Sequence, residues 1–109
     1  MSTETLPFRL LLSACADAGT AEQIAGTLVE EGLAACVTLL PGARSIYRWQ
    51  GRLERAEECV LLIKTRADAY PALERRLLAL HPYDIPELLA LPVLAGNPAY
   101  LKWLEAVGA

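Results

Sequence analysis

The densest group of side chains that could do chemistry lies in residues 81–87, with the sequence HPYDIPE. It contains His81, the chain's sole histidine, together with Tyr83, Asp84 and Glu87. Its two prolines restrict the backbone, so these polar groups are held in fixed directions. An imidazole titrates near neutral pH and is a frequent ligand of copper and zinc. The segment therefore predicts either a ligand-binding or proton-transfer site, or a rigid loop whose polar groups cap the preceding helix.

Three cysteines could supply further metal ligands, but they form no C-x-x-C pair. A metal site needs three or four donors, so the rest would be a thiol, a carboxylate or the same residues of neighbouring copies. Cys36 and Cys59 fall in predicted strands, where a free cysteine is usually buried. Their separation of roughly 20 Å along the strands exceeds the ~7 Å limit for a disulfide. Cys15 follows the first predicted strand at a sheet end, and we expect it to be more accessible.

A charged residue and two aromatic residues complete the set of candidates. Lys64 lies late in an apolar predicted strand, where a charge is costly unless it is paired. Glu87 and an anionic ligand are both possible partners, and a structural ion pair is as reasonable as a site. Tyr47 and Trp49 could line a ligand pocket, although packing at an interface is favoured.

Hydrophobic periodicity predicts the elements that position these residues. An apolar strand over 8–14 precedes a helix that starts with a capping box at Thr20 and closes at Gly32. Two long strands, 33–49 and 52–65, follow. The second helix is capped by Asp68 and ends at His81, because Pro82 disfavours helical geometry there.

A nearly continuous apolar run over 87–93 predicts an interior fourth strand, and Asn97-Pro98 predicts the start of a last helix. The order strand, helix, strand, strand, helix, strand, helix is the split βαβ, ferredoxin-like arrangement with one extra helix. Right-handed crossovers then place the first and third strands at the centre of an antiparallel sheet. The fold class is therefore α+β.

The two long strands meet at Gln50-Gly51 in a predicted hairpin. Each arm would reach roughly 45 to 50 Å if straight, against a radius of gyration of about 13 Å for a compact chain of this length. Pro41-Gly42 offers a place to bend. The tip carries large apolar residues that one ribbon cannot bury, namely Ile46, Tyr47, Trp49 and Leu53. We therefore expect an obligate homo-oligomer in which copies cover one another's hairpins.

Composition limits the remaining possibilities. The chain of 109 residues predicts a single domain, 1–109, with a short N-terminal tail over 1–7. A net charge of -3 with no basic cluster argues against a nucleic-acid or membrane-surface partner. No leader pattern is present at the N-terminus, so the expected compartment is the cytoplasm. Phosphate-loop, dinucleotide-binding and nucleophile-elbow motifs are absent from the sequence.

The chain resembles the CutA divalent-ion tolerance family in a series of motifs that run in the family's order from about 8 to 107. They are LAACV at 33–37, PG at 41–42, SIYRWQG at 45–51, KT at 64–65, HPY at 81–83, PEL at 86–88, LPV at 91–93 and YLKWL at 100–104. The resemblance implies a ferredoxin-like trimer built through long hairpins, similar to the PII signalling trimers. It also implies a link to copper and divalent-ion tolerance without an enzymatic reaction.

The resemblance also implies site residues. The family's intersubunit cleft corresponds to Cys36, Trp49, Lys64, His81, Tyr83 and Glu87. For the family's proposed copper ligands, Ser13 stands at the cysteine position and Leu80 at one of two histidines. His81 and Cys15, two residues after Ser13, are then the metal ligands that we expect.

The leading prediction is a homotrimeric, non-enzymatic protein that binds copper(II) or another divalent ion at an intersubunit cleft and has no organic cofactor. One alternative is a PII-like sensor that binds a small molecule or anion and signals to a partner protein, which Lys64 favours. Another is a structural trimeric scaffold that binds neither.

Overall fold

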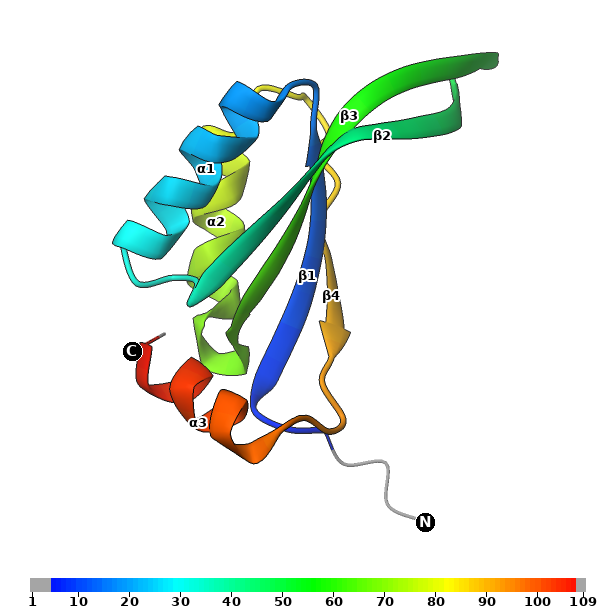
Figure 1. Cartoon of the computed structure of the whole chain (residues 1–109). Coiled ribbons are helices and arrows are strands. Elements are labelled where there is room, and N and C mark those ends of the chain that lie inside the picture. The colour runs from blue at the N-terminus through cyan, green and yellow to red at the C-terminus, as the bar shows by residue number, and fades with distance from the viewer. Residues whose placement is uncertain (1–4, 108–109) are drawn as a thin grey trace.

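Two helices cover one face of a four-stranded antiparallel sheet and leave the opposite face open (Figure 1). This is the arrangement in the computed structural model of the chain, which describes residues 5–107. No helix in that range is long and apolar enough to cross a membrane. The elements are β1 (Phe8–Cys15), α1 (Ala18–Glu30), β2 (Cys36–Trp49), β3 (Arg52–Arg66), η1 (Ala67–Ala69), α2 (Tyr70–Leu80), β4 (Leu89–Pro92) and α3 (Pro98–Val107).

The strand order is β2-β3-β1-β4, which confirms the predicted ferredoxin-like sheet with the first and third strands at its centre. The core lies between the sheet and the pair α1 and α2, because alternate residues of β1 and β3 point to that side. Fully buried examples are Leu11 and Ile63 from the sheet and Leu28 and Leu77 from the helices. The short helix α3 packs across one end of the sheet through Leu104.

Helix α1 begins earlier than the capping box at Thr20 predicted. The residue that caps it is Asp17, whose Oδ1 accepts the Thr20 backbone N–H at 2.7 Å. Thr20 is the third residue of the helix, and its hydroxyl donates to the same carboxylate, so Thr20 lies inside the first turn and does not cap it. The predicted end is confirmed, since Gly32 follows the helix in the left-handed region with φ of 74°.

Helix α2 also starts differently from the prediction. Asp68 lies in the single turn η1 and pairs with the Arg66 guanidinium, so it does not cap α2. The end is as predicted, because His81 is already extended before Pro82. The start of α3 is confirmed as well: Asn97 Oδ1 accepts the Ala99 N–H at 3.0 Å.

The hairpin of β2 and β3 turns at Gln50 and Gly51, both with positive φ, as predicted. A β-bulge between Leu40 and Ala43 marks the predicted bend, with Gly42 at φ of 78°. Beyond it the ribbon leans away from α1 and α2 and out of the body (Figure 1). The chain is accordingly extended, with a radius of gyration of 14.8 Å and extents of 43 × 36 × 23 Å.

Strand β4 contradicts the prediction of an interior strand over 87–93. It spans only Leu89–Pro92. Its place at the edge of the sheet, paired with β1 alone, is the one that the predicted topology gives to the fourth strand. Leu89 and Leu91 are 58% and 46% exposed, because the sheet face to which they point has no helix over it. The apolar side chains Leu89 and Leu91 of β4 therefore form part of a sheet surface that no helix covers.

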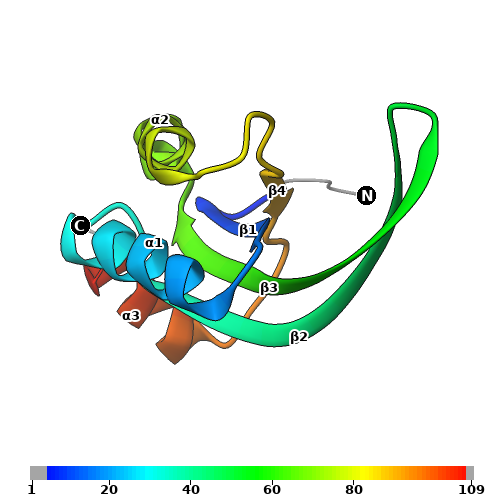
Figure 2. The ribbon, with the colours of Figure 1, turned by 90° about the horizontal axis from the view of Figure 1, so that it is seen from above.

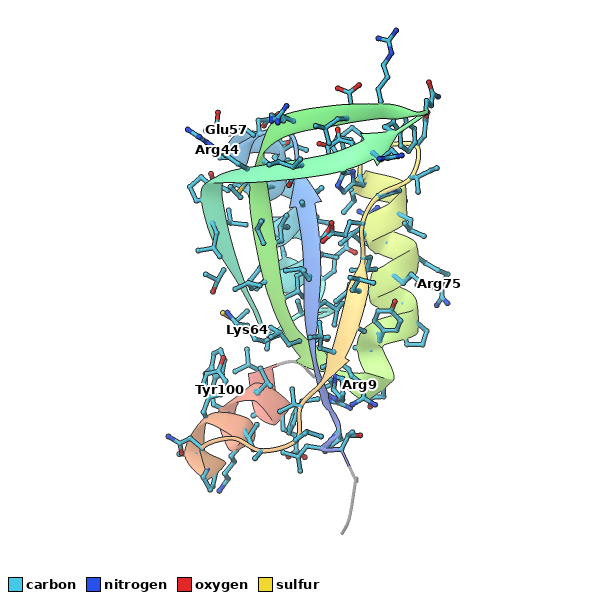
Figure 3. The ribbon with its side chains drawn as sticks, turned by 90° about the vertical axis from the view of Figure 1, so that its right-hand side faces the viewer. Arg9, Arg44, Glu57, Lys64, Arg75 and Tyr100 are labelled. Carbon is cyan, nitrogen blue, oxygen red and sulfur yellow. The ribbon has the colours of Figure 1, made fainter. Side chains whose placement is uncertain are left out.

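We call this surface the open face (Figure 3). Register pairs place its members on one side of all four strands. The aliphatic ones are Leu10 and Leu12 of β1, Leu40 of β2, Val60 and Leu62 of β3, and Leu89 and Leu91 of β4.

The prediction of a tail over 1–7 is wrong for its last two residues, Leu6 and Pro7. Leu6 donates its N–H to Val93 O at 2.8 Å, and Pro7 O accepts the Ala67 N–H at 2.9 Å, so both are tied to the body. The rest of that prediction, residues 1–4, lies outside the described residues.

The capping assignment predicts that Asp17→Ala lowers the melting temperature by a few degrees, because the first turn of α1 loses its acceptor. Thermal unfolding followed by circular dichroism measures the shift. Glu22→Ala, on the exposed side of the same helix, is the control and leaves the melting temperature nearly unchanged. Equal shifts for the two variants would contradict the assignment.

Candidate functional site

A groove of about 610 Å³ lies on the open side of the molecule, between the bent hairpin and the segment after α2. One wall is formed by hairpin residues and the other by the loop that carries the HPYDIPE sequence. The lining residues are Ala14, Ser45, Ile46, Tyr47, Trp49, Glu58, Tyr83, Asp84, Ile85 and Glu87.

The bulge determines which hairpin residues face this groove. Leu40 pairs with Val60 and Ala43 with Glu58, so β2 has one residue more than β3 at the bend. Past it, the odd-numbered residues of β2 lie on the same side as the even-numbered residues of β3. Tyr47 and Trp49 are therefore on the side of Glu58.

The second wall is anchored to the end of β1. Ser13 Oγ donates to the Glu87 carbonyl oxygen at 2.7 Å, and Ser13 is buried. Ser13 thus holds the backbone of the loop, and no contact of the described residues gives it a metal-binding role.

Three carboxylates line the groove: Glu58, Asp84 and Glu87. The Tyr83 hydroxyl donates to Glu58 Oε2 at 3.0 Å and so joins the two walls. Partial burial of the phenol, and secondarily its hydrogen bond to Glu58, raise the pKa of Tyr83 to about 12. Carboxylate oxygens are hard donors that suit divalent cations.

His81 is buried directly behind this wall, at 6% exposure. Its Nδ1 accepts the Tyr83 backbone N–H at 3.1 Å, so the ring proton is on Nε2, which donates to the Ala14 carbonyl oxygen at 2.7 Å. The ring also packs against that of Tyr83, with centroids 4.6 Å apart. His81 therefore positions Tyr83 at the groove, and either nitrogen could bind a metal only after losing a hydrogen bond.

Cys15 is fully buried, which contradicts the prediction that it is accessible. It is the last residue of β1 rather than a residue beyond it, and it points to the covered side of the sheet opposite Cys59. Burial is the main reason that the pKa of the Cys15 thiol is raised to about 11. Its Sγ lies 3.6 Å from His81 Nε2, so the two predicted metal ligands do meet.

These two donors do not make a complete metal site. Within residues 5–107, no group of three His, Cys, Asp or Glu side chains is arranged to hold an ion. A closed site would need further donors from a second copy or a rearrangement of the groove carboxylates.

Lys64 lies at the other end of the open face (Figure 3), and Cys36 is its register partner on β2. Lys64 Nζ donates to Thr38 Oγ1 at 2.5 Å and lies 3.8 Å from Cys36 Sγ. Lys64 pairs with Leu10, four residues or about 13 Å along β1 from the groove residue Ala14. One chain thus brings Trp49, Tyr83 and Glu87 together but not Cys36 and Lys64.

The ion pair considered between Lys64 and Glu87 does not form within the chain. The salt bridges among residues 5–107 are Arg66–Asp68 and Arg76–Glu31.

Glu58 and Ser45 are lining residues that sequence reasoning missed. The signal for Glu58 was the alternation of β3, which places it on the side of Val60 and Leu62. Ser45 could not have been placed without the position of the bulge.

Fold and groove together define a ferredoxin-like domain with a projecting hairpin and an acidic, aromatic groove beside it. Comparison with known proteins identifies the group to which it belongs. The family model described as CutA1 divalent ion tolerance protein matches residues 9–107. The chain belongs to this family, as its motifs predicted.

Relatives agree in sequence and in structure. The divalent-cation tolerance protein CutA of Thermus thermophilus is 55% identical over 85 residues, covering 78% of this chain and 82% of the relative. That of Pectobacterium atrosepticum is 50% identical over 97 residues, covering 89% and 88%. The crystal structure of CutA from Xylella fastidiosa has a TM-score of 0.92 at 49% identity, covering 95% of this chain and all of that one.

The raised pKa of Tyr83 predicts a loss of stability in alkali. Between the ordinary phenol pKa of 10.0 and the value of about 12 in the fold, the unfolded chain releases this proton and the folded chain keeps it. The free energy of unfolding therefore falls as pH rises through this interval. Denaturation by urea at a series of pH values measures the decline.

The variant Tyr83→Phe makes that decline less steep. It does not abolish it, because burial also raises the pKa of Tyr70 and of Cys15. Tyr100→Phe, on α3 away from the groove, is the matched control and keeps the full slope. The assignment would be wrong if both variants followed the wild-type curve.

Proposed function

We propose that this chain acts in divalent-cation tolerance as a homotrimer that binds a divalent metal ion, copper(II) foremost, at the groove between subunits. The observation that carries the proposal is the gathering of Glu58, Asp84 and Glu87 around one groove. Membership of the CutA1 family supports the role in tolerance. The family is named for tolerance and not for a reaction, which agrees with a non-enzymatic protein.

The open face supports the assembly. Aliphatic side chains cover it on all four strands, and Leu40, Leu89 and Leu91 are about half exposed in a single chain. Contiguous apolar patches of this kind are unusual on monomers and mark interaction surfaces. A second copy of the chain is a matching occupant, because its own open face is equally apolar.

The hairpin tip supports the same conclusion. Ile46 and Leu53 are 64% and 61% exposed, and no other strand or helix of residues 5–107 lies against the ribbon beyond the bulge. Figure 2 shows this ribbon standing apart from the sheet and helices. Isolated two-stranded ribbons are marginal in water, so an adjacent subunit would stabilise it. Three copies is the number that the PII-like architecture implies.

Charge supports a cation in the groove. Three ionised carboxylates on one concave surface repel one another, and a divalent ion relieves that repulsion. Copper(II) has the highest affinity of the first-row divalent ions for nitrogen and oxygen donors. His81 would contribute only after release of Ala14 or Tyr83, and the donors missing from one chain would come from the neighbouring subunit.

The same charges disfavour an anion sensor at this groove. The cation that suggested that alternative, Lys64, lies about 13 Å away along the sheet and already donates to Thr38. A trimeric scaffold without ligands would not need a groove lined by three carboxylates.

The assembly is tested by sedimentation equilibrium, where we expect the mass of three chains. Leu62→Glu, which places a charge at the centre of the open face, should dissociate the assembly. Leu78→Glu is the matched control, because Leu78 is 46% exposed but lies on α2, away from the open face. A wild-type chain that stays a monomer at all concentrations would overturn the proposal.

Ion binding is tested by calorimetric titration of copper(II) into the assembled protein. Asp84→Asn and Glu87→Gln each remove one groove charge, and we expect affinity to fall roughly tenfold or more. Glu105→Gln removes an exposed carboxylate of α3 outside the groove and should bind like wild type. The groove is not the binding site if all three variants bind equally well.

A further inference from the structure

Cys15 and Cys59 stand directly opposite each other in the antiparallel pair of β1 and β3. Both are free thiols, 0% and 2% exposed, and both belong to the core between the sheet and the helices. Their side chains therefore point to the same side of the sheet. Neither thiol is needed for the groove, whose lining includes neither residue.

The register gives this pair the spacing of a disulfide. Directly opposite residues in antiparallel strands have Cα atoms about 4.5 or 5.5 Å apart, according to the type of pair. Both values fall within the roughly 4.4–6.8 Å found in disulfides. Cys15 is the last residue of β1 and is followed by exposed residues, so its backbone can adjust by the small amount that a bond requires.

We propose that Cys15 and Cys59 form a redox modification site, in which a peroxide converts the two thiols into an intrachain disulfide. One of the two thiols gives up its proton and attacks one peroxide oxygen to become a sulfenic acid, as hydroxide leaves and takes up that proton to give water. The sulfur of the other cysteine then attacks the sulfenic sulfur, and a second water leaves. Two thiols and one hydrogen peroxide thus give one disulfide and two waters.

The position of Cys15 links this reaction to the groove. Its Sγ lies 3.6 Å from His81 Nε2, and His81 Nδ1 holds the backbone of Tyr83. A bond to Cys59 fixes the sulfur toward β3 and changes its contact with the imidazole. The disulfide therefore alters the environment of the residue that positions Tyr83. This inference does not depend on metal binding.

The third cysteine provides an internal control. Cys36 pairs with Lys64 and belongs to the open face, on the opposite side of the sheet from the other two. It has no cysteine opposite it in the register, so it should remain a thiol.

The test treats the assembled Cys36→Ser protein with hydrogen peroxide, blocks remaining thiols under denaturing conditions and measures mass. We expect each chain to lose two hydrogen atoms and to take up no blocking group, with peptide mapping joining 15 to 59. In the wild type, free thiols should fall from three to one. Recovery of Cys15 and Cys59 as blocked thiols, or their oxidation to separate sulfinic acids, would overturn the proposal.

A second measurement uses the chain's sole histidine, whose ring proton NMR signal needs no assignment among others. Oxidation should shift this signal in Cys36→Ser and raise the melting temperature, because the bond closes a long loop. Cys36→Ser combined with Cys59→Val, a volume-conserving change in the core, should show neither effect. An unchanged histidine signal in the oxidised Cys36→Ser protein would refute the link to His81.

Discussion

The structure depends on one constraint: the chain has helices for only one face of its sheet. Every strand alternates, so the covered side collects Leu11, Ile63 and the helix residues into a core, while an equally apolar row is left on the other side. Burying that row would release apolar surface from water at roughly 25 cal/mol per Å². The hairpin that extends past the body adds further exposed apolar surface. The association proposed above would cover this row and the exposed residues of the hairpin.

The groove follows from this arrangement. It exists because the hairpin bends over the open side and because the loop after α2 is tied to the end of β1 through Ser13 and His81. The anchoring side chains Ser13 and His81 are buried, whereas Asp84 and Glu87 are exposed and Glu58 is half-buried. The carboxylates are thus held in fixed directions by buried residues, and none of them is fully buried itself. Full burial of an unpaired charge would be costly.

Local features could be predicted from the sequence: the turn at Gln50-Gly51, the bend at Pro41-Gly42 and the cap at Asn97 each depend on neighbouring residues. The strand order followed from the right-handed sense of the crossover connections. The distance between Lys64 and Glu87 could not be predicted, because it depends on the register of β1 with β3. The burial of Cys15 was missed because the strand runs one residue further than its apolar pattern.

The extra residue at the bulge sets the phase of the whole ribbon beyond it. With Pro41 and Gly42 together opposite Cys59, the aromatic Tyr47 and Trp49 turn inward. If the same residues alternated regularly from Leu40 onward, without the bulge, the even-numbered set that includes Arg44 and Arg48 would lie on this side in place of Tyr47 and Trp49. Two guanidinium groups would then stand beside the carboxylates of β3 and the loop after α2. One unpaired residue at the corner between Leu40 and Ala43 thus keeps two cationic side chains out of the groove, although that corner is not part of the groove lining.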